Sequence, residues 1–275
     1  MSFLRPISSL ERGDHACLIY DDPARRDDVL LTFLESGLAT GDRVVYLADD
    51  ADGRIVEQLT LLARPEQFAA IGSRETFLVD GAFDAERVLT SFRTVRDDSL
   101  AAGFHGVRAA GEPPESLRRN GCSRSLTEYE RRANQLFESG DMAAICAYDT
   151  RTTNAEALVG LIEAHPVVLF AVGANPRLRI EAAETGAIEL RGWLDLTTLG
   201  SLVGPLSAAV TSFDDVVVDL AEVDFIDVAG LRLFVEAADL LHRRDGKLTL
   251  RSTPAWIGRV LDVLGYGNRE GLILQ

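Results

Sequence analysis

The sequence predicts an α/β fold in two domains, the first built on a mainly parallel sheet and the second smaller. From His15 to about Val172, short apolar runs alternate with segments whose apolar residues recur at helical spacing, the pattern of strands joined by crossover helices. The run Gly-Ala-Asn-Pro at 173–176 interrupts this alternation and indicates a boundary. After it, the expected order is strand, strand, helix, strand, helix, strand, helix. We therefore place the domains at residues 1–174 and 177–275.

The first domain is expected to alternate strands and helices along its length. In the segment 84–102, for example, Val88, Phe92 and Val95 fall on one helical face. Such alternation is typical of a parallel sheet covered by helices on both faces. The strands are expected at residues 16–20, 43–47, 76–79, 106–109, 143–147 and 167–172, and the helices at 23–36, 55–62, 84–102, 125–138 and 155–163.

The second domain is expected to begin with a hairpin across Thr185 and Gly186. The β-branched run Val216-Val217-Val218 is typical of a strand covered on both faces. After a tight turn at 227–231, apolar residues recur at helical spacing. The expected elements are strands 178–183 and 187–193, helix 196–210, a strand from 216, a helix to 241, strand 248–251, helix 254–264 ended by Gly265, and a short strand 272–274.

Charge and cysteine content exclude several classes of function. The chain has 28 basic and 43 acidic residues and a net charge of −15, so nucleic acid is not an expected partner. No apolar run reaches about 18 residues and the first residues lack a signal-peptide core, so we expect a cytoplasmic protein without membrane contact. Cys17, Cys122 and Cys146 form no Cys-x-x-Cys pair, which argues against a disulfide or a cysteine zinc site. Cys17 and Cys146 are interpreted as buried, inert thiols.

The turn after the first strand lacks the residues of a phosphate-binding loop. Between Tyr20 and Asp28 there is no glycine or lysine, and Lys247 is the only lysine in the chain. ATP hydrolysis is therefore not expected there. The run HACLIYDDPARRDDVLLTFLESGLATGDRVVYLAD, followed later by FLVDGAFDAERVL, LTEYERRANQLF and AAICAYDT, resembles the MEDS domain, a sensory module of methanogen and methylotroph regulators. The resemblance implies a degenerate RecA-like sheet that senses a small molecule.

Candidate residues of the sensory pocket lie where open α/β sheets bind ligands, beyond the carboxyl ends of strands. Structural alternatives stay open: a strand end for Glu112, a cap for Tyr148-Asp149, and a hydrogen-bonded core residue for His15. Glu130 is interpreted as a solvated helix charge and His165 as a turn residue. No metal-ligand spacing stands out and no cofactor is expected. The candidates are Tyr20, Asp21, Asp49, Glu112, Tyr148 and Asp149, together with His15 at the start of its strand.

The segment Asp227-Val228-Ala229-Gly230-Leu231 follows a strand and opens a helix. In this setting it resembles the central turn of the STAS domain, the fold of anti-sigma factor antagonists. STAS domains commonly have Asp-Ser-Ser-Gly-Leu or Asp-Ser-Xaa-Gly-Leu here, with a serine that an anti-sigma kinase phosphorylates. In this chain both candidate positions are aliphatic, Val228 and Ala229. The resemblance implies that residues 227–231 dock a partner without the usual phosphoacceptor.

Together, the two resemblances imply a bacterial signalling regulator, and no enzymatic activity is expected. A sensory domain would bind a small signal, and the STAS domain would present a docking surface to an anti-sigma factor or related serine kinase. No Ser-His-Asp order or paired acid and base indicates catalysis. Two alternatives stay open: a scaffolding protein that assembles with other STAS proteins, and a nucleotide-dependent enzyme in the first domain.

Overall fold

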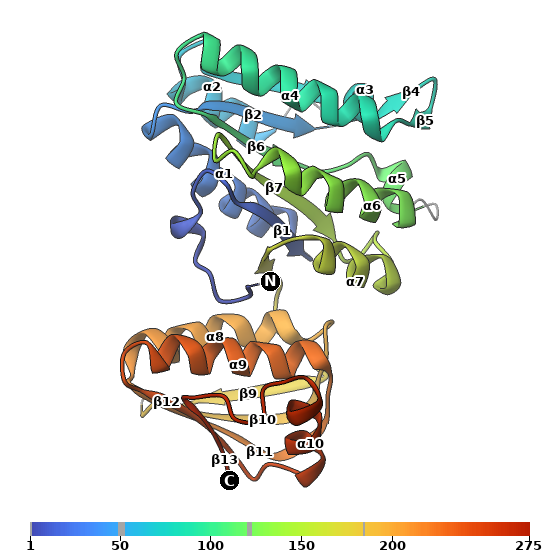
Figure 1. Ribbon diagram of the computed structural model, residues 1–275. Helices are drawn as coiled ribbons and strands as arrows, with labels where there is room; N and C mark the ends of the chain where they lie inside the picture. The colour runs from blue at the N-terminus through green and yellow to red at the C-terminus, as the bar shows by residue number, and fades with distance from the viewer. Residues whose placement is uncertain (1, 49–52, 120–122, 184) are drawn as a thin grey trace. The chain divides into compact units, whose positions relative to one another are not determined.

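The computed structural model describes residues 2–48, 53–119, 123–183 and 185–275. Within it the chain divides into two compact units, Met1–Ala171 and Val172–Gln275 (Figure 1). Each unit has its own sheet, and the two are described separately below. Among the described residues, no helix combines the length and the apolar character needed to cross a membrane.

The first unit is built on a six-stranded sheet in which every neighbouring pair of strands is parallel. The strand order is β3-β2-β6-β7-β1-β8, so β1 lies in the interior between β7 and β8. This confirms the predicted parallel sheet. The strands are β1 (His15–Tyr20), β2 (Arg43–Ala48), β3 (Phe68–Gly72), β6 (Val107–Gly111), β7 (Met142–Asp149) and β8 (Val167–Ala171).

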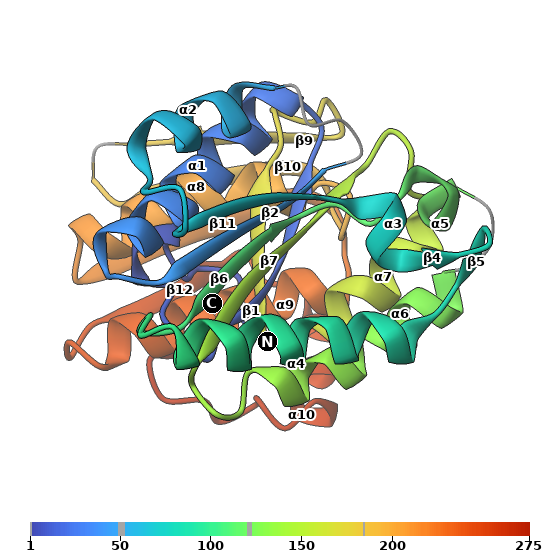
Figure 2. The same ribbon diagram turned by 90° about the horizontal axis from the view of Figure 1, so that it is seen from above.

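Helices cover both faces of this sheet, as Figure 2 shows. One face carries α1 (Pro23–Ala39) and α2 (Arg54–Leu62), and the other carries α4 (Ala85–Ala101), α6 (Ser123–Ala133) and α7 (Ala155–Ala164). Short polar side chains begin three of them: Asp22, Asp84 and Asn154 accept hydrogen bonds from backbone N–H groups of the first turns of α1, α4 and α7. The shorter helical segments are Ile7–Ser9, α3 (Ser73–Phe77), α5 (Glu115–Arg119) and Asn134–Leu136.

The strand predicted at 76–79 is wrong. The third strand of the sheet is β3, and residues 73–77 form α3 instead. The segment Phe68–Gly72 contains two alanines and stays partly exposed at the sheet edge, so its apolar signal is weak. Leu78–Val79 pairs only with Ala82–Phe83, in a separate hairpin, β4 and β5.

A buried ion pair lies beneath α1. Asp42 is fully buried and accepts hydrogen bonds from Arg108 Nε at 3.1 Å and from Arg12 at 2.8 Å. The Arg108 guanidinium also donates to Ser36 Oγ at 2.7 Å and lies over the ring of Phe33, 5.0 Å from its centroid. Arg108 on β6 is thereby joined to α1 and to the loop that precedes β2.

The second unit contains a five-stranded sheet of order β13-β12-β11-β10-β9. As predicted, β9 and β10 form an antiparallel hairpin, and the other neighbours are parallel. In β11, Val216 and Val218 are buried and Val217 is half-buried, so the prediction of a strand covered on both faces is wrong. The elements are β9 (Leu178–Ala182), β10 (Ala187–Leu194), α8 (Leu199–Ser212), β11 (Asp215–Ile226), α9 (Val228–His242), β12 (Lys247–Arg251), α10 (Ala255–Val263) and β13 (Leu272–Leu274).

Candidate functional site

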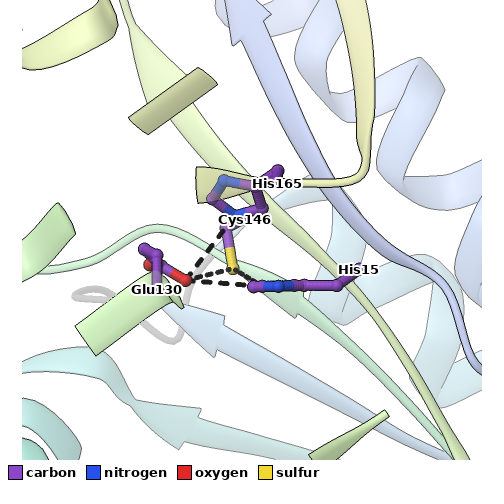
Figure 3. A group of neighbouring side chains, drawn as sticks. All are labelled: His15, Glu130, Cys146 and His165. Atoms are coloured by element: carbon purple, nitrogen blue, oxygen red, sulfur yellow. Dashed lines mark hydrogen bonds and ion pairs between the residues drawn. The ribbon is translucent and has the colours of Figure 1, made fainter. Parts of the chain in front are cut away.

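Four side chains from distant parts of the sequence meet in the first unit, as Figure 3 shows. His15 begins β1, Glu130 lies on α6, Cys146 lies in β7, and His165 follows α7. Glu130 Oε2 lies 3.4 Å from His15 Nε2 and 3.5 Å from His165 Nε2. Cys146 Sγ lies 3.5 Å from His15 Nε2 and 3.7 Å from Glu130 Oε2. We call these four residues the buried tetrad.

The parallel pairing of β1 with β7 brings two of these residues together. His15 pairs with Ala144, and Cys17 pairs with Cys146. Because every second side chain of a strand points to the same face, His15 and Cys146 point to the same face of the sheet. That face is the one covered by α6 and α7. Residues 16, 18 and 20 point to the other face and pack in the core beneath α1.

A second set of contacts orients the tetrad. His15 Nδ1 donates to Asn134 Oδ1 at 3.0 Å, and the Asn134 amide donates in turn to Ala164 O at 2.8 Å. His165 Nδ1 donates to Leu161 O at 2.7 Å. The Tyr148 hydroxyl donates to Glu130 Oε1 at 2.6 Å. The ring of Phe137 stacks on His15, with centroids 4.5 Å apart. Each ring and the carboxylate are therefore held in one orientation.

Burial and mutual proximity set the ionisation of the tetrad. Burial and the neighbouring His15 lower the pKa of His165 to about 4. Burial and Glu130 raise the pKa of the Cys146 thiol well above its usual value. For Glu130, burial opposes ionisation, but its interactions with His15, His165 and Tyr148 outweigh burial and lower its pKa. At neutral pH His165 is thus neutral, Cys146 a thiol and Glu130 a carboxylate.

A cavity of about 40 Å³ lies beside the tetrad. His15 and Cys146 line it together with apolar side chains such as Phe77, Phe92 and Tyr129. A cavity needs about 10–15 Å³ of such volume to hold a single water molecule. The cavity can therefore hold a molecule of only a few atoms, with the tetrad forming part of its wall.

A second polar group lies at the carboxyl edge of the same sheet, and its member Glu112 also lines the cavity. Glu112, just after β6, accepts a hydrogen bond from the Tyr20 hydroxyl at 2.7 Å and another from Arg26. Asp149, at the end of β7, accepts three hydrogen bonds from the Arg151 guanidinium, at 2.6 and 3.2 Å to Oδ2 and at 2.9 Å to Oδ1. Both carboxylates at this edge are therefore bound by arginines.

In the second unit, Asp227 shapes the turn between β11 and α9. Its Oδ1 accepts from Gly230 N at 2.9 Å, which caps α9, and its Oδ2 accepts from Leu196 N at 3.0 Å. A methyl group at position 230 would lie 2.9 Å from carbons of Ile226 and Leu194, so the close packing here requires glycine. Asp227 thus fixes two adjacent segments, the start of α9 and the loop after β10.

An exposed apolar patch lies beside this turn. Trp193 and Phe225, opposite each other on β10 and β11, are 44% and 42% exposed, and their ring centroids are 5.4 Å apart. Val228, at the start of α9, is also 42% exposed. The Arg177 guanidinium lies 4.9 Å from the centroid of the Trp193 ring. We call Trp193 and Phe225 the aromatic patch. Exposed aromatic side chains of this kind are typical of protein interfaces.

Comparison with protein families identifies both units. The model of the MEDS family, the methanogen/methylotroph, DcmR sensory domain, matches residues 14–166. The chain belongs to the MEDS family. A STAS domain model, described as Mlab, STAS domain, matches residues 179–275. The two matches confirm, in the same order, the resemblances seen in the sequence. The protein therefore carries a MEDS sensory domain followed by a STAS domain.

Comparisons with individual proteins give distant likenesses only. No curated protein matches the chain. Among solved structures, the unphosphorylated anti-sigma factor antagonist SpoIIAA matches with 17% identity and a TM-score of 0.30, over 36% of this chain and 87% of that one. The phosphorylated Bacillus cell fate determinant SpoIIAA matches with 17% identity and a TM-score of 0.29, over 36% of this chain and 90% of that one. A Pyrococcus horikoshii OT3 protein matches with 9% identity and a TM-score of 0.41, over 71% of this chain and 94% of that one. At these scores, none of the three likenesses extends to function.

The predicted sensory residues of the MEDS domain lie at two places, the carboxyl edge and the tetrad, and one cavity reaches both, since Glu112 and His15 line it. Tyr20 and Glu112 are joined at the carboxyl edge, and Asp149 lies at this edge beside Arg151. Asp21 lies just after β1 and is 3.6 Å from Arg25. His15 and Tyr148 instead belong to the tetrad and its support. Asp49 and Cys122 lie outside the described residues. Of the described candidates, His15 and Glu112 line the cavity, and Tyr20, Asp21, Tyr148 and Asp149 are not among its lining residues.

One interpretation made from the sequence is wrong, and it concerns the tetrad. Glu130 is 1% exposed, so it is not a solvated helix charge. His165 lies in the connection between α7 and β8, as expected of a turn residue, and is 2% exposed. Glu130 has charged neighbours along α6, which is typical of an exposed helix face. It is buried because it lies on the face of α6 that is directed toward the sheet. The four residues are far apart in the sequence and form no local motif.

The predicted docking segment is only partly exposed. Leu231 is 1% exposed and Gly230 is buried, so these residues support the turn from inside and offer no side-chain surface to a partner. Trp193 and Phe225 were not predicted, because the two strands that carry them pair only in the folded sheet.

Proposed function

We propose that this protein is a non-enzymatic signalling regulator, in which the MEDS domain binds a small molecule and the STAS domain docks an anti-sigma factor or related serine kinase. The observation that carries the proposal is the order of the two domains in one chain, with a STAS turn held by Asp227 but lacking a hydroxyl at position 229. Control of docking then comes from the sensory domain rather than from phosphorylation of this turn.

The docking surface is formed by the exposed part of the turn and the aromatic patch. Val228 and the half-buried Ala229 lie at the start of α9, and Trp193 and Phe225 extend the apolar surface across two strands. Rigid aromatic side chains bury a large area on binding at a small cost in conformational entropy. Asp227, Gly230 and Leu231 hold this surface in place from within.

The sensory function is proposed for the cavity beside His15 and for the carboxyl edge with Tyr20, Asp21, Glu112 and Asp149. Tyr148 supports the first of these through Glu130. The cavity is small and mainly apolar, which favours a compact, weakly polar signal molecule. The edge has arginines bound to carboxylates and no phosphate-binding loop, which argues against a nucleotide.

A direct binding measurement tests the docking proposal. The full chain is titrated by calorimetry with anti-sigma kinases from the same genome, and we expect one of them to bind with a Kd of about 1 μM or tighter, near −8 kcal/mol. The negative control is the same kinase mixed with a chain that carries Val228→Asp, which places a charge in the proposed interface. Binding of none of the kinases, together with stable assembly with other STAS proteins, would favour a scaffold instead.

Ala229→Ser is expected to restore a phosphoacceptor at the docking turn. The change adds one hydroxyl at a half-buried position near the helix start, and phosphorylation there would add about −1.5 to −2 charges at the interface. A kinase that binds the wild type should then incorporate phosphate into the variant, and its affinity for the modified chain should fall. Phosphate incorporation is measured by intact mass spectrometry, with the wild-type chain as the control. Equal labelling of the two chains would place the modified residue elsewhere.

A further inference from the structure

Four of the six distances between ligand atoms of the buried tetrad match those between ligands of one metal ion. In tetrahedral zinc sites, bonds of about 2.0–2.2 Å to nitrogen or oxygen and about 2.3 Å to sulfur separate neighbouring ligand atoms by about 3.3–3.7 Å. The four distances described above run from 3.4 to 3.7 Å, and all four ligand atoms lie within 4.8 Å of one another. Direct N–H···O hydrogen bonds would be shorter, at about 2.7–3.2 Å.

Both histidines direct Nε2 into the tetrad because Nδ1 is engaged elsewhere. The Nδ1 partners of His15 and His165 are oxygen acceptors, and this network places a proton on Nδ1 of each ring. His165 Nε2 is buried and makes no hydrogen bond. It faces the Glu130 carboxylate at 3.5 Å, so two acceptors face each other in the interior. A cation bound between them would satisfy both.

The charge of the ligand set also fits a dication. Glu130 contributes one negative charge, and Cys146 contributes a second once a bound metal ion displaces its thiol proton. These two charges balance a divalent ion, which keeps the buried site neutral. A thiolate and two imidazoles favour zinc and related transition metals over Mg²⁺ and Ca²⁺, which prefer oxygen ligands.

The residues around the tetrad act as the supporting shell that metal sites require. Asn134 and the Leu161 carbonyl fix the two imidazole rings, and the Tyr148 hydroxyl fixes the carboxylate. Asn134 is itself held through its amide by Ala164 O. The ligand atoms are therefore preorganised before any ion binds.

From these observations we propose that His15, Glu130, Cys146 and His165 bind one divalent transition-metal ion, Zn²⁺ being the ion that the ligand set fits best. The site lies within the MEDS domain and does not depend on the docking surface of the STAS domain. The cavity next to it gives a small molecule access to the His15 and Cys146 side of the ion.

Metal content and a cobalt spectrum test the proposal on the full chain. We expect the purified protein to bind one Zn²⁺ per chain, and Co²⁺ in its place to give a thiolate-to-cobalt charge-transfer band with the intense visible bands of a tetrahedral ion. Cys146→Ala should abolish the charge-transfer band. Cys17→Ala is the matched control, because Cys17 is a buried cysteine at the paired position of β1 and should leave the band unchanged.

A second variant keeps all four ligands. Asn134→Ala removes the hydrogen bond to His15 Nδ1 and should weaken Zn²⁺ binding by about 10- to 100-fold, measured by competition with a chromogenic chelator. Circular dichroism establishes that each chain is folded. The proposal is overturned if the folded wild type binds neither Zn²⁺ nor Co²⁺ at micromolar concentration. It is equally overturned if the charge-transfer band survives Cys146→Ala or disappears with Cys17→Ala.

Discussion

Asp42→Ala is expected to destabilise the MEDS domain by about 3–5 kcal/mol, because it leaves the buried Arg108 guanidinium without its counter-ion. Asp42 is fully buried and Arg108 is 6% exposed, so water cannot replace the lost carboxylate. The remaining contacts of Arg108, with Ser36 Oγ and the Phe33 ring, leave its charge uncompensated.

Urea denaturation with two signals measures this effect in the full chain. Both tryptophans, Trp193 and Trp256, lie in the second unit, so tryptophan fluorescence reports the STAS domain and far-ultraviolet circular dichroism reports both domains. We expect Asp42→Ala to shift the dichroism transition to lower urea and to leave the fluorescence transition in place.

Asp28→Ala is the matched control for this experiment. Asp28 forms an ion pair with Arg54 at 2.7 Å, and both side chains are more than half exposed. Such surface pairs contribute about 0–1 kcal/mol, so this variant should unfold close to the wild type. A loss of less than about 1 kcal/mol for Asp42→Ala would mean that Arg108 reaches solvent when its partner is removed.

Trp193→Ala is expected to weaken binding of the anti-sigma partner by about 30-fold, and Phe225→Ala by a similar factor. Exposed aromatic residues near the centre of an interface typically contribute at least about 2 kcal/mol, and each 1.4 kcal/mol is about tenfold in affinity. The two rings contact each other, so the double variant should lose less than the sum of the single losses.

Trp256→Ala provides the control for these variants. Trp256 is also an exposed tryptophan of the STAS domain, at 38%, but it lies on α10. Its removal should leave the affinity unchanged when both are measured by calorimetry against the same partner. Equal losses for Trp193→Ala and Trp256→Ala would indicate general destabilisation and would contradict the proposed docking surface.

The alternation of apolar segments was sufficient to predict the parallel sheet, most of its helices and the order of elements in the STAS domain. Strongly apolar strands such as β1 and β7 are buried whatever their neighbours, so their sequence alone indicates them. The edge strand β3 was missed because its alanines pack weakly and stay partly exposed.

The candidate site was harder to predict because its members are brought together only by tertiary packing. The sequence places His15 at the start of a strand, but whether Glu130 is buried or exposed depends on which face of α6 packs on the sheet. Likewise, the burial of Leu231 and the exposure of Phe225 follow from the register of β10 with β11. Sequence periodicity gives the face of an element but not the neighbour that covers it.

The alternation along β1 gives the buried tetrad a further role in assembly of the sheet. His15 points to the face covered by α6, and Ala16 and Leu18 pack beneath α1. A slip of one residue between β1 and β7 would turn His15 toward the apolar side and leave Glu130 buried beside a methyl group. That arrangement would bury the imidazole of His15 among apolar side chains and remove its contact with Glu130, which is unfavourable. The buried tetrad thus favours the observed alignment of β1 with β7 over an alignment shifted by one residue.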